Sequence, residues 1–216
     1  MKDTLLTINN WLGDLFPGGE IGRKLVHAAG AVFPALYFLP FVTWTHVTVL
    51  LVVVTTIVGI LEVLRLRYGL QLFFYQLLLR EYETDSPAAY MLYMLSMTVV
   101  AVVFEPMIAI PAILMLALAD PIAGFASDDE LRRIKRPTAL AAMFVVSALL
   151  ALPFAYETPL GVALGAAGAT IADGVKPSVR GFILDDDLTI APLAAFGLWV
   201  GTHADSLSVA TAPALA

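Results

Sequence analysis

Basic residues occur in only every second connection between the long apolar stretches of this chain. The basic connections, with all twelve Lys and Arg, carry Lys2, Arg23 and Lys24; then Arg65, Arg67 and Arg80; then Arg132, Arg133, Lys135 and Arg136; and finally Lys176 and Arg180. The connections around residues 41–45, 104–106 and 153–159 and the C-terminal tail have none. If each apolar stretch crosses a membrane once, all twelve cations share one side. Short loops rich in Lys and Arg stay in the cytoplasm, so the pattern predicts that this side is cytosolic.

The apolar stretches are long enough to cross a bilayer, which takes roughly 17–25 apolar residues in a helix. The chain is 60% hydrophobic and 14% charged. The candidate stretches are residues 24–42, 45–63, 88–104, 106–125, 138–156, 158–175 and 188–203. We therefore expect an all-α, multi-pass protein of the cell membrane. It should form a single integral membrane domain over residues 1–216, with about seven transmembrane helices and a cytosolic N-terminus.

Two segments that mix polar and apolar residues lie outside these stretches. Residues 1–16 are too polar for a cleavable signal peptide, and residues 1–19 are expected to lie in the membrane interface, with Trp11 and Phe16 toward lipid. Residues 64–86 repeat Leu and Phe at helical spacing, which predicts an amphipathic cytosolic connection on the membrane surface. The alternative for residues 64–86 is a continuation of the second span.

Composition excludes two classes of function. The chain has no cysteine, which rules out disulfides and thiol chemistry. Its net charge of −6 argues against nucleic acid as a partner.

Ionisable residues gather at the cytosolic ends of the spans, where they are costly and by default mark function. They are Arg23, Lys24, His27, Glu62, Arg65, Asp120, Asp173, Lys176, Asp185, Asp186 and Asp187. Carboxylates bind Mg²⁺ through oxygen, whereas Arg and Lys neutralise phosphate. Phosphoryl transfer needs mainly positioning and charge neutralisation. The pattern is therefore typical of a nucleotide–metal site that meets a lipid alcohol at the membrane boundary.

Each group also has a structural interpretation. Arg23 and Lys24 suit membrane anchors, and His27 suits a packed, hydrogen-bonded histidine. Glu62 and Arg65, at i and i+3, suit a local ion pair. The triplet 185–187 suits the capping of a helix N-terminus. The cations at 132–136 suit topology determinants.

Four sequence elements resemble the CTP-dependent polyprenol kinase family of dolichol and phytol kinases. They are GEIGRKLVHAAG at 19–30, EVLRLRYG at 62–69, ALADPIAGFA at 117–126 and DDDLTIAPL at 185–193. The resemblance implies a membrane kinase that transfers the terminal phosphate of CTP to an isoprenoid alcohol with Mg²⁺ or another divalent cation.

The resemblance also implies roles for individual residues. Catalytic roles fall to Asp120, Asp185 and Asp186, and metal binding to Asp120, Asp173, Asp186 and Asp187. Nucleotide binding falls to Arg132, Arg133, Lys135, Arg136, Thr138 and Lys176. Lipid-binding or structural polar roles fall to Arg23, Lys24, His27, Glu62 and Arg65.

The loop after Asp120 departs from the family pattern. Residues 127–130 replace the expected glycines, and 136–141 replace a Lys-Ser/Thr-x-Glu-Gly element, of which only Thr138 matches the hydroxyl. Two alternatives therefore stay open: a non-catalytic lipid-binding relative, and a cytidylyltransferase acting on a lipid phosphate. The sequence leaves the lipid, the choice of CTP over ATP and the oligomeric state undetermined.

Overall fold

The structure is a computed structural model that describes residues 19–70, 72, 75, 79, 83–126, 135–155, 157–175, 178–179, 182–183 and 185–211. The helices are α2 (Gly19–Ala29), α3 (Val32–Ala35), η1 (Leu36–Phe38), α4 (Trp44–Tyr68), α6 (Ala89–Val103), α7 (Pro106–Leu114), η3 (Met115–Ala119), α8 (Asp120–Phe125), α9 (Pro137–Ala155), α10 (Pro159–Gly174) and α11 (Asp186–Thr211). The strands β1 (Ser178–Val179) and β2 (Phe182–Ile183) form a short antiparallel hairpin. The all-α prediction is confirmed, with this hairpin as the one addition among the described residues.

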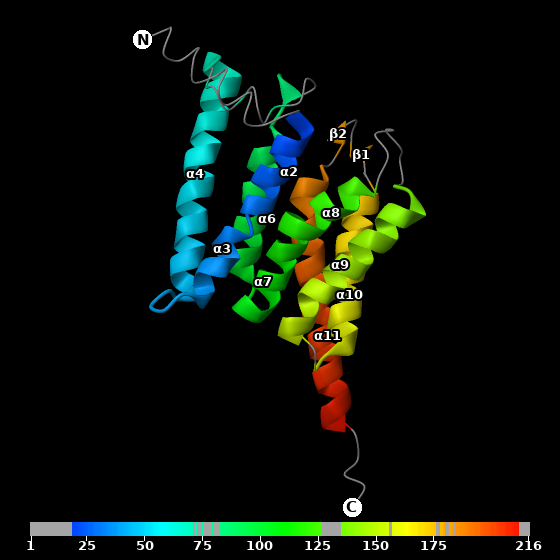
Figure 1. Ribbon diagram of the computed structural model, residues 1–216. Helices are drawn as coiled ribbons and strands as arrows, with labels where there is room; N and C mark the ends of the chain where they lie inside the picture. The colour runs from blue at the N-terminus through cyan, green and yellow to red at the C-terminus, as the bar shows by residue number, and fades with distance from the viewer. Residues whose placement is uncertain are drawn as a thin grey trace, which may run out of the picture.

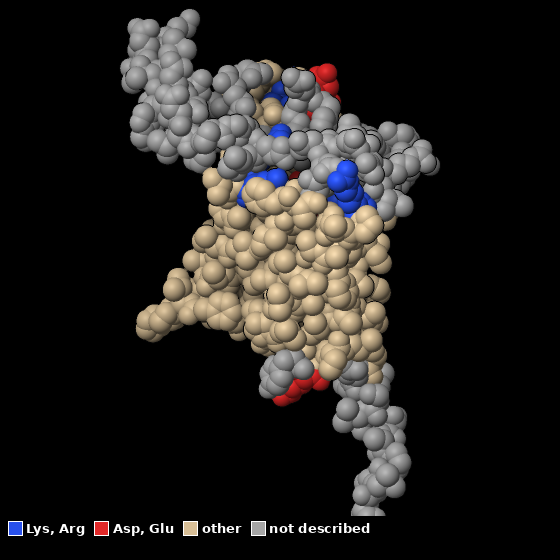
Figure 2. All heavy atoms as spheres, turned by 45° about the vertical axis from the view of Figure 1, so that its right-hand side comes forward, with Lys and Arg blue, Asp and Glu red and all other residues tan. Residues whose placement is uncertain are grey.

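The helices stand side by side as a bundle, with the β1–β2 hairpin at the same end as the start of α2 and the end of α4 (Figure 1). Three segments are long and apolar enough to cross a membrane: Trp44–Tyr68, Pro106–Phe125 and Pro137–Ala155. On the face seen in Figure 2, a broad band free of charged side chains separates an end with Lys, Arg and some Asp or Glu from an end with Asp or Glu. This apolar band is what a bilayer requires of a protein surface.

Capping residues set both ends of α4. The Thr43 side chain accepts a hydrogen bond from the His46 backbone, and the His46 ring accepts one from the Thr43 backbone, a reciprocal capping box. At the other end, Gly69 adopts the left-handed conformation with φ 66°, which costs glycine little. Helix α4 therefore continues to Tyr68, into the segment expected to be a surface connection. Most of residues 70–82 lie outside the described part.

The first expected span, residues 24–42, is divided into three short helical pieces. Helix α2 begins earlier, at Gly19, and ends at Ala29; α3 and η1 follow after a turn at Gly30 and Ala31. The interfacial segment expected at residues 1–19 lies outside the described residues except for Gly19. The last helix, α11, extends beyond the expected 188–203 at both ends.

Helices α10 and α11 pack closely because both present glycines to the other. A Cβ at Gly168 would overlap the backbone carbonyl of Leu193, and one at Gly197 would overlap that of Leu164. Small residues allow such backbone approach in membrane proteins. The contact fixes the end of α10, which carries Asp173, against the beginning of α11.

The expected span 106–125 contains a change of helix type. Helix α7 is an α-helix. It is followed by η3, a π-helical turn over Met115–Ala119, and α8 then begins at Asp120. A π-turn holds one residue more than an α-turn and occurs often at functional sites. Asp120 follows it directly.

Candidate functional site

Carboxylates from three helices, one histidine and one lysine meet at the end of the bundle near the hairpin. Their side chains come from α2, α8, the residues before α9, α10 and the first turn of α11, and they are His27, Asp120, Lys135, Asp173, Asp186 and Asp187. These segments are far apart in sequence. We call these six residues the acidic cluster.

Lys135 is the central cation of the acidic cluster. Its Nζ bonds Asp173 Oδ1 and lies 3.4 Å from Asp186 Oδ2 and 3.8 Å from Asp120 Oδ1. Burial alone lowers the pKa of Lys135, but the charges of Asp186, Asp120 and Asp173 outweigh it and raise that pKa above its ordinary value. Lys135 therefore carries a fixed positive charge.

The cluster contains two groups of potential metal ligands that share Asp120. One is Asp120, Asp173 and Asp186; the other is His27, Asp120 and Asp187; within each group the ligand atoms lie within 4.8 Å of one another. Asp173 is fully buried, and its Oδ2 has no hydrogen-bond partner among the described residues. A buried carboxylate oxygen without a partner is costly. The all-carboxylate group therefore fits a hard cation such as Mg²⁺.

His27 joins the acidic cluster to α6. Its Nε2 lies 3.2 Å from Asp187 Oδ1, and its Nδ1 lies 3.7 Å from Asp120 Oδ2. The hydroxyl of Tyr93 donates a hydrogen bond of 2.7 Å to the His27 carbonyl, and the two rings meet edge to face. Gly30 makes room for this contact, because a Cβ there would overlap the Tyr93 hydroxyl.

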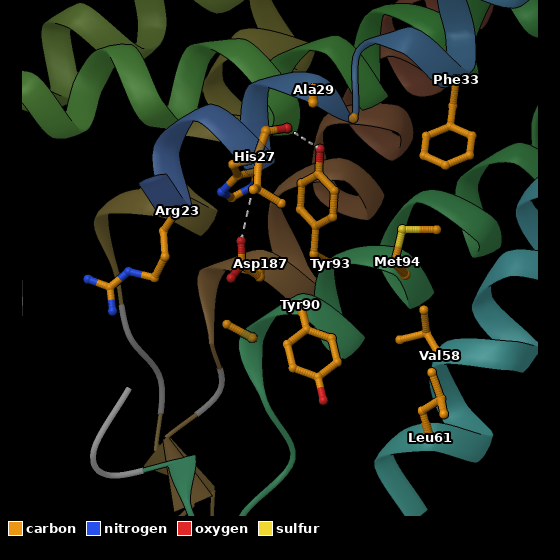
Figure 3. A pocket seen from close by; sticks show the side chains of 13 residues that line it. Arg23, His27, Ala29, Phe33, Val58, Leu61, Tyr90, Tyr93, Met94 and Asp187 are labelled. Carbon is orange, nitrogen blue, oxygen red and sulfur yellow. Dashed lines mark hydrogen bonds and ion pairs between the residues drawn. The ribbon is translucent and has the colours of Figure 1, made fainter. Parts of the chain in front are cut away.

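A cavity of about 320 Å³ adjoins the cluster (Figure 3). It lies between α2, α3, α4 and α6, and one end reaches His27 and Asp187. The opposite end is apolar and is formed by Phe33, Val58 and Met94. The cavity thus connects charged groups of the cluster with the side of the bundle formed by α4.

The predicted nucleotide-binding residues are only partly placed. Lys135 belongs to the cluster, whereas Arg136 and Thr138 are exposed at the beginning of α9. Arg132, Arg133 and Lys176 lie outside the described residues. Nucleotide binding by these five remains a prediction.

Asp185 differs from Asp186 and Asp187 in what its side chain contacts. Its Oδ1 accepts a hydrogen bond of 3.1 Å from the backbone of Asp187, so it caps α11. The capping interpretation of the triplet therefore applies to Asp185, whereas Asp186 and Asp187 face the cluster. The catalytic role predicted for Asp185 stays a prediction.

Glu62 and Arg65 form a buried ion pair that organises the segment before α6. Arg65 donates two hydrogen bonds to Glu62, of 2.9 and 2.7 Å, and others to the carbonyls of Thr84 and Ser86. Glu62 in turn accepts hydrogen bonds from the Ala88 backbone and the Tyr90 hydroxyl. These contacts give the pair a structural role.

The remaining two N-terminal cations are separated. Lys24 lies over the ring of Phe125, 4.2 Å from its centroid, and so connects α2 with α8. Arg23 lines the cavity at its polar end.

Sequence reasoning missed Tyr90 and Tyr93, which line the cavity and contact Glu62 and His27. Two tyrosines three residues apart in an apolar span were the available signal, because buried hydroxyls seek partners.

Comparison with known proteins identifies no relative. No family model, no curated protein and no solved structure matches this chain.

Proposed function

We propose that this protein is a multi-pass membrane kinase that transfers the terminal phosphate of CTP to an isoprenoid alcohol at the cytosolic face. The alcohol is of the dolichol, phytol or geranylgeraniol type. The observation that supports the proposal is the convergence of Asp120, Asp173, Asp186 and Asp187 around Lys135 and His27. Such a cluster matches the demands of phosphoryl transfer, which are positioning and charge neutralisation.

The topology belongs to the same proposal. About seven crossings with a cytosolic N-terminus place all basic connections on one side. The acidic cluster then lies at the cytosolic end of the apolar band, within reach of a soluble nucleotide and of a lipid alcohol. The choice of CTP over ATP rests on the sequence resemblance.

In this proposal, the acidic residues bind the metal and the basic residue binds phosphate. Asp120, Asp173 and Asp186 would hold the Mg²⁺, which would supply positive charge to neutralise the phosphate oxygens. Lys135 adds positive charge for the terminal phosphate, since its ammonium is fixed among these same carboxylates. His27 and Asp187 complete the site toward the lipid.

The cost of burying the cluster argues against the non-catalytic alternative. A protein that only binds lipid gains nothing from four carboxylates gathered at one membrane depth, since such groups are expensive there. The cytidylyltransferase alternative uses the same metal and nucleotide but needs a lipid that already carries phosphate.

The test is phosphate transfer by the purified protein in lipid vesicles. The assay supplies γ-labelled CTP or ATP, Mg²⁺ and either a panel of isoprenoid alcohols or an isoprenoid phosphate. We expect label to enter the lipid with CTP, and Asp120→Asn to lose at least about a hundredfold in rate while keeping the wild-type thermal unfolding profile. Release of pyrophosphate with a lipid phosphate would instead establish the cytidylyltransferase. No reaction with either lipid by folded protein would leave the non-catalytic relative.

A further inference from the structure

The cavity beside the acidic cluster is chemically polarised along its length. His27 and Asp187 form one end, and Phe33, Val58 and Met94 form the other (Figure 3). Along α4, Val58 lies four residues before Glu62, which places it about 6 Å further into the apolar band. A molecule that fills this cavity must therefore be an amphiphile with its polar end toward Asp187.

The cavity opens on the outer surface of the bundle. Val26, in its wall, is 42% exposed, and Ala29 is exposed as well. On the neighbouring turns of α4, Ile57 and Ile60 are 52% and 56% exposed, so this side of the bundle is apolar. The surface around the opening suits contact with lipid, and the remainder of a long chain can extend from the cavity into the bilayer.

The size of the cavity restricts the occupant. About 320 Å³ is at the lower end of the range for ligand pockets. It accommodates the first part of one chain, and the paired chains of a phospholipid need more room.

The charge of the polar end restricts the headgroup. Asp187 faces the cavity, and Asp120 lies on the other side of His27. Arg23 is the one Lys or Arg in the described lining, and Figure 3 shows its guanidinium directed away from Tyr93. Carboxylates repel a lipid phosphate, whereas a neutral hydroxyl can donate a hydrogen bond to them.

We propose that a single-chain alcohol enters laterally between α2 and α4 and places its hydroxyl between His27 and Asp187. This inference rests on the proposed kinase function, and it divides the acidic cluster into two halves. Asp173 and Asp186 serve the metal and nucleotide, His27 and Asp187 serve the acceptor alcohol, and Asp120 belongs to both halves. The terminal phosphorus of the nucleotide then lies beside Asp120.

The transfer balances with these groups alone. The alcohol oxygen forms a bond to the terminal phosphorus, and the bond from that phosphorus to the bridging oxygen breaks. The nucleoside diphosphate leaves with the electron pair of the broken bond. The hydroxyl proton passes to the Asp187 carboxylate, whose Oδ1 lies 3.2 Å from His27 Nε2.

The experiment combines photolabelling with kinetics on the full chain in phosphatidylcholine vesicles. The probe is geranylgeraniol carrying a diazirine, with unlabelled geranylgeraniol as competitor. The variants are Val58→Trp, which fills the cavity, and Ile57→Trp, its matched control on the lipid side of the same helix. A third variant, Asp187→Asn, removes the proton acceptor and leaves the cavity walls intact.

We expect competed label in residues 19–38 and 44–68 of the wild type and of Ile57→Trp. Val58→Trp should lose most of this label and raise the KM for the alcohol at least about tenfold, which corresponds to about 1.4 kcal/mol of binding, with an unchanged KM for nucleotide. Asp187→Asn should keep the label and lower kcat at least about a hundredfold.

Equal labelling of Val58→Trp and Ile57→Trp would overturn the proposed entry site, and wild-type kcat in Asp187→Asn would overturn the role of Asp187. The kinase function has a separate failure. If the wild type transfers no phosphate but its label is still lost in Val58→Trp, the lipid site stands and the kinase proposal falls.

Discussion

Lys135 and Asp173 form one of two contacts that connect the segment before α9 to the end of α10. The ammonium bonds the fully buried carboxylate, and the Lys135 backbone donates a hydrogen bond of 3.3 Å to the carbonyl of the adjacent Gly174. The side chain thereby occupies the position from which it reaches Asp120 and Asp186 as well. Without a metal, this single cation offsets the repulsion among three carboxylates.

Replacing Lys135 should therefore make folding depend on Mg²⁺. Lys135→Met leaves Asp173 buried without its cation, which should cost roughly 3 kcal/mol of unfolding free energy. Because a divalent cation can then take the place of the ammonium, Mg²⁺ should raise the unfolding midpoint of Lys135→Met more than that of the wild type. Thermal unfolding in detergent, with and without millimolar Mg²⁺, measures this difference. Lys135→Arg is the control that retains the charge. Equal Mg²⁺ shifts in Lys135→Met and wild type would show that no cation replaces the ammonium.

Two adjacent aspartates should respond differently to the same substitution. Asp185→Asn keeps a good helix cap, so its phosphate transfer should stay within about twofold of the wild type. Asp186→Asn removes a carboxylate that faces Lys135 and should lower kcat at least about a hundredfold. Steady-state kinetics of the two purified variants gives both values. A large loss in Asp185→Asn would support the catalytic role predicted from the sequence.

Gly30 should tolerate no side chain. In Gly30→Ala the new methyl group overlaps the Tyr93 hydroxyl, so the ring must move and its hydrogen bond to the His27 carbonyl is lost. Tyr93→Phe removes the same hydrogen bond without overlap and should cost about 1 kcal/mol of stability. We expect Gly30→Ala to cost more, and to raise the KM for the alcohol because the cavity wall shifts. Melting curves and steady-state kinetics of both variants test this prediction. If Gly30→Ala has the stability and KM of the wild type, the steric argument is wrong.

The α10–α11 contact should be sensitive to one methyl group. Gly197→Ala forces the new Cβ against the Leu164 carbonyl, so unfolding free energy should fall by about 1–3 kcal/mol. Gly124→Ala is the matched control, since its nearest neighbour would be the flexible Lys24 side chain at 3.6 Å. Denaturant titration of the two variants tests the contrast. Because Ala favours the helix more than Gly does, equal stability of the two variants would show that close packing at Gly197 is not limiting.

Much of the helical architecture was readable from the sequence because most apolar runs are bounded by charges or Pro. The stretch 138–156, for example, corresponds to α9 at Pro137–Ala155. The break after Ala29 was not readable, since GAVFPALYF is apolar throughout. The end of α4 was also missed, because only the conformation of Gly69 shows where the helix stops.

The site was predicted as a set of residues but not as an arrangement. The ends of the spans predicted which carboxylates share one depth, and Asp120, Asp173 and Asp186 do come together. Periodicity gives no information on which neighbour a side chain faces, so the sequence could not separate Asp185 from Asp186. It also could not single out Lys135 from the neighbouring cations, because that distinction depends on the packing of α10 against α9.

The π-helical turn at Met115–Ala119 makes the direction of Asp120 a matter of residue number. An α-helix turns by about 100° per residue, and a π-turn takes up one extra residue within the turn, so the same residues in a regular α-helix would rotate Asp120 by about that angle away from Lys135 and His27. Every residue of the turn except Leu118 is buried and apolar, and none supplies a reactive group. The direction of the shared carboxylate thus depends on one extra residue in the backbone of the turn rather than on any side chain within it.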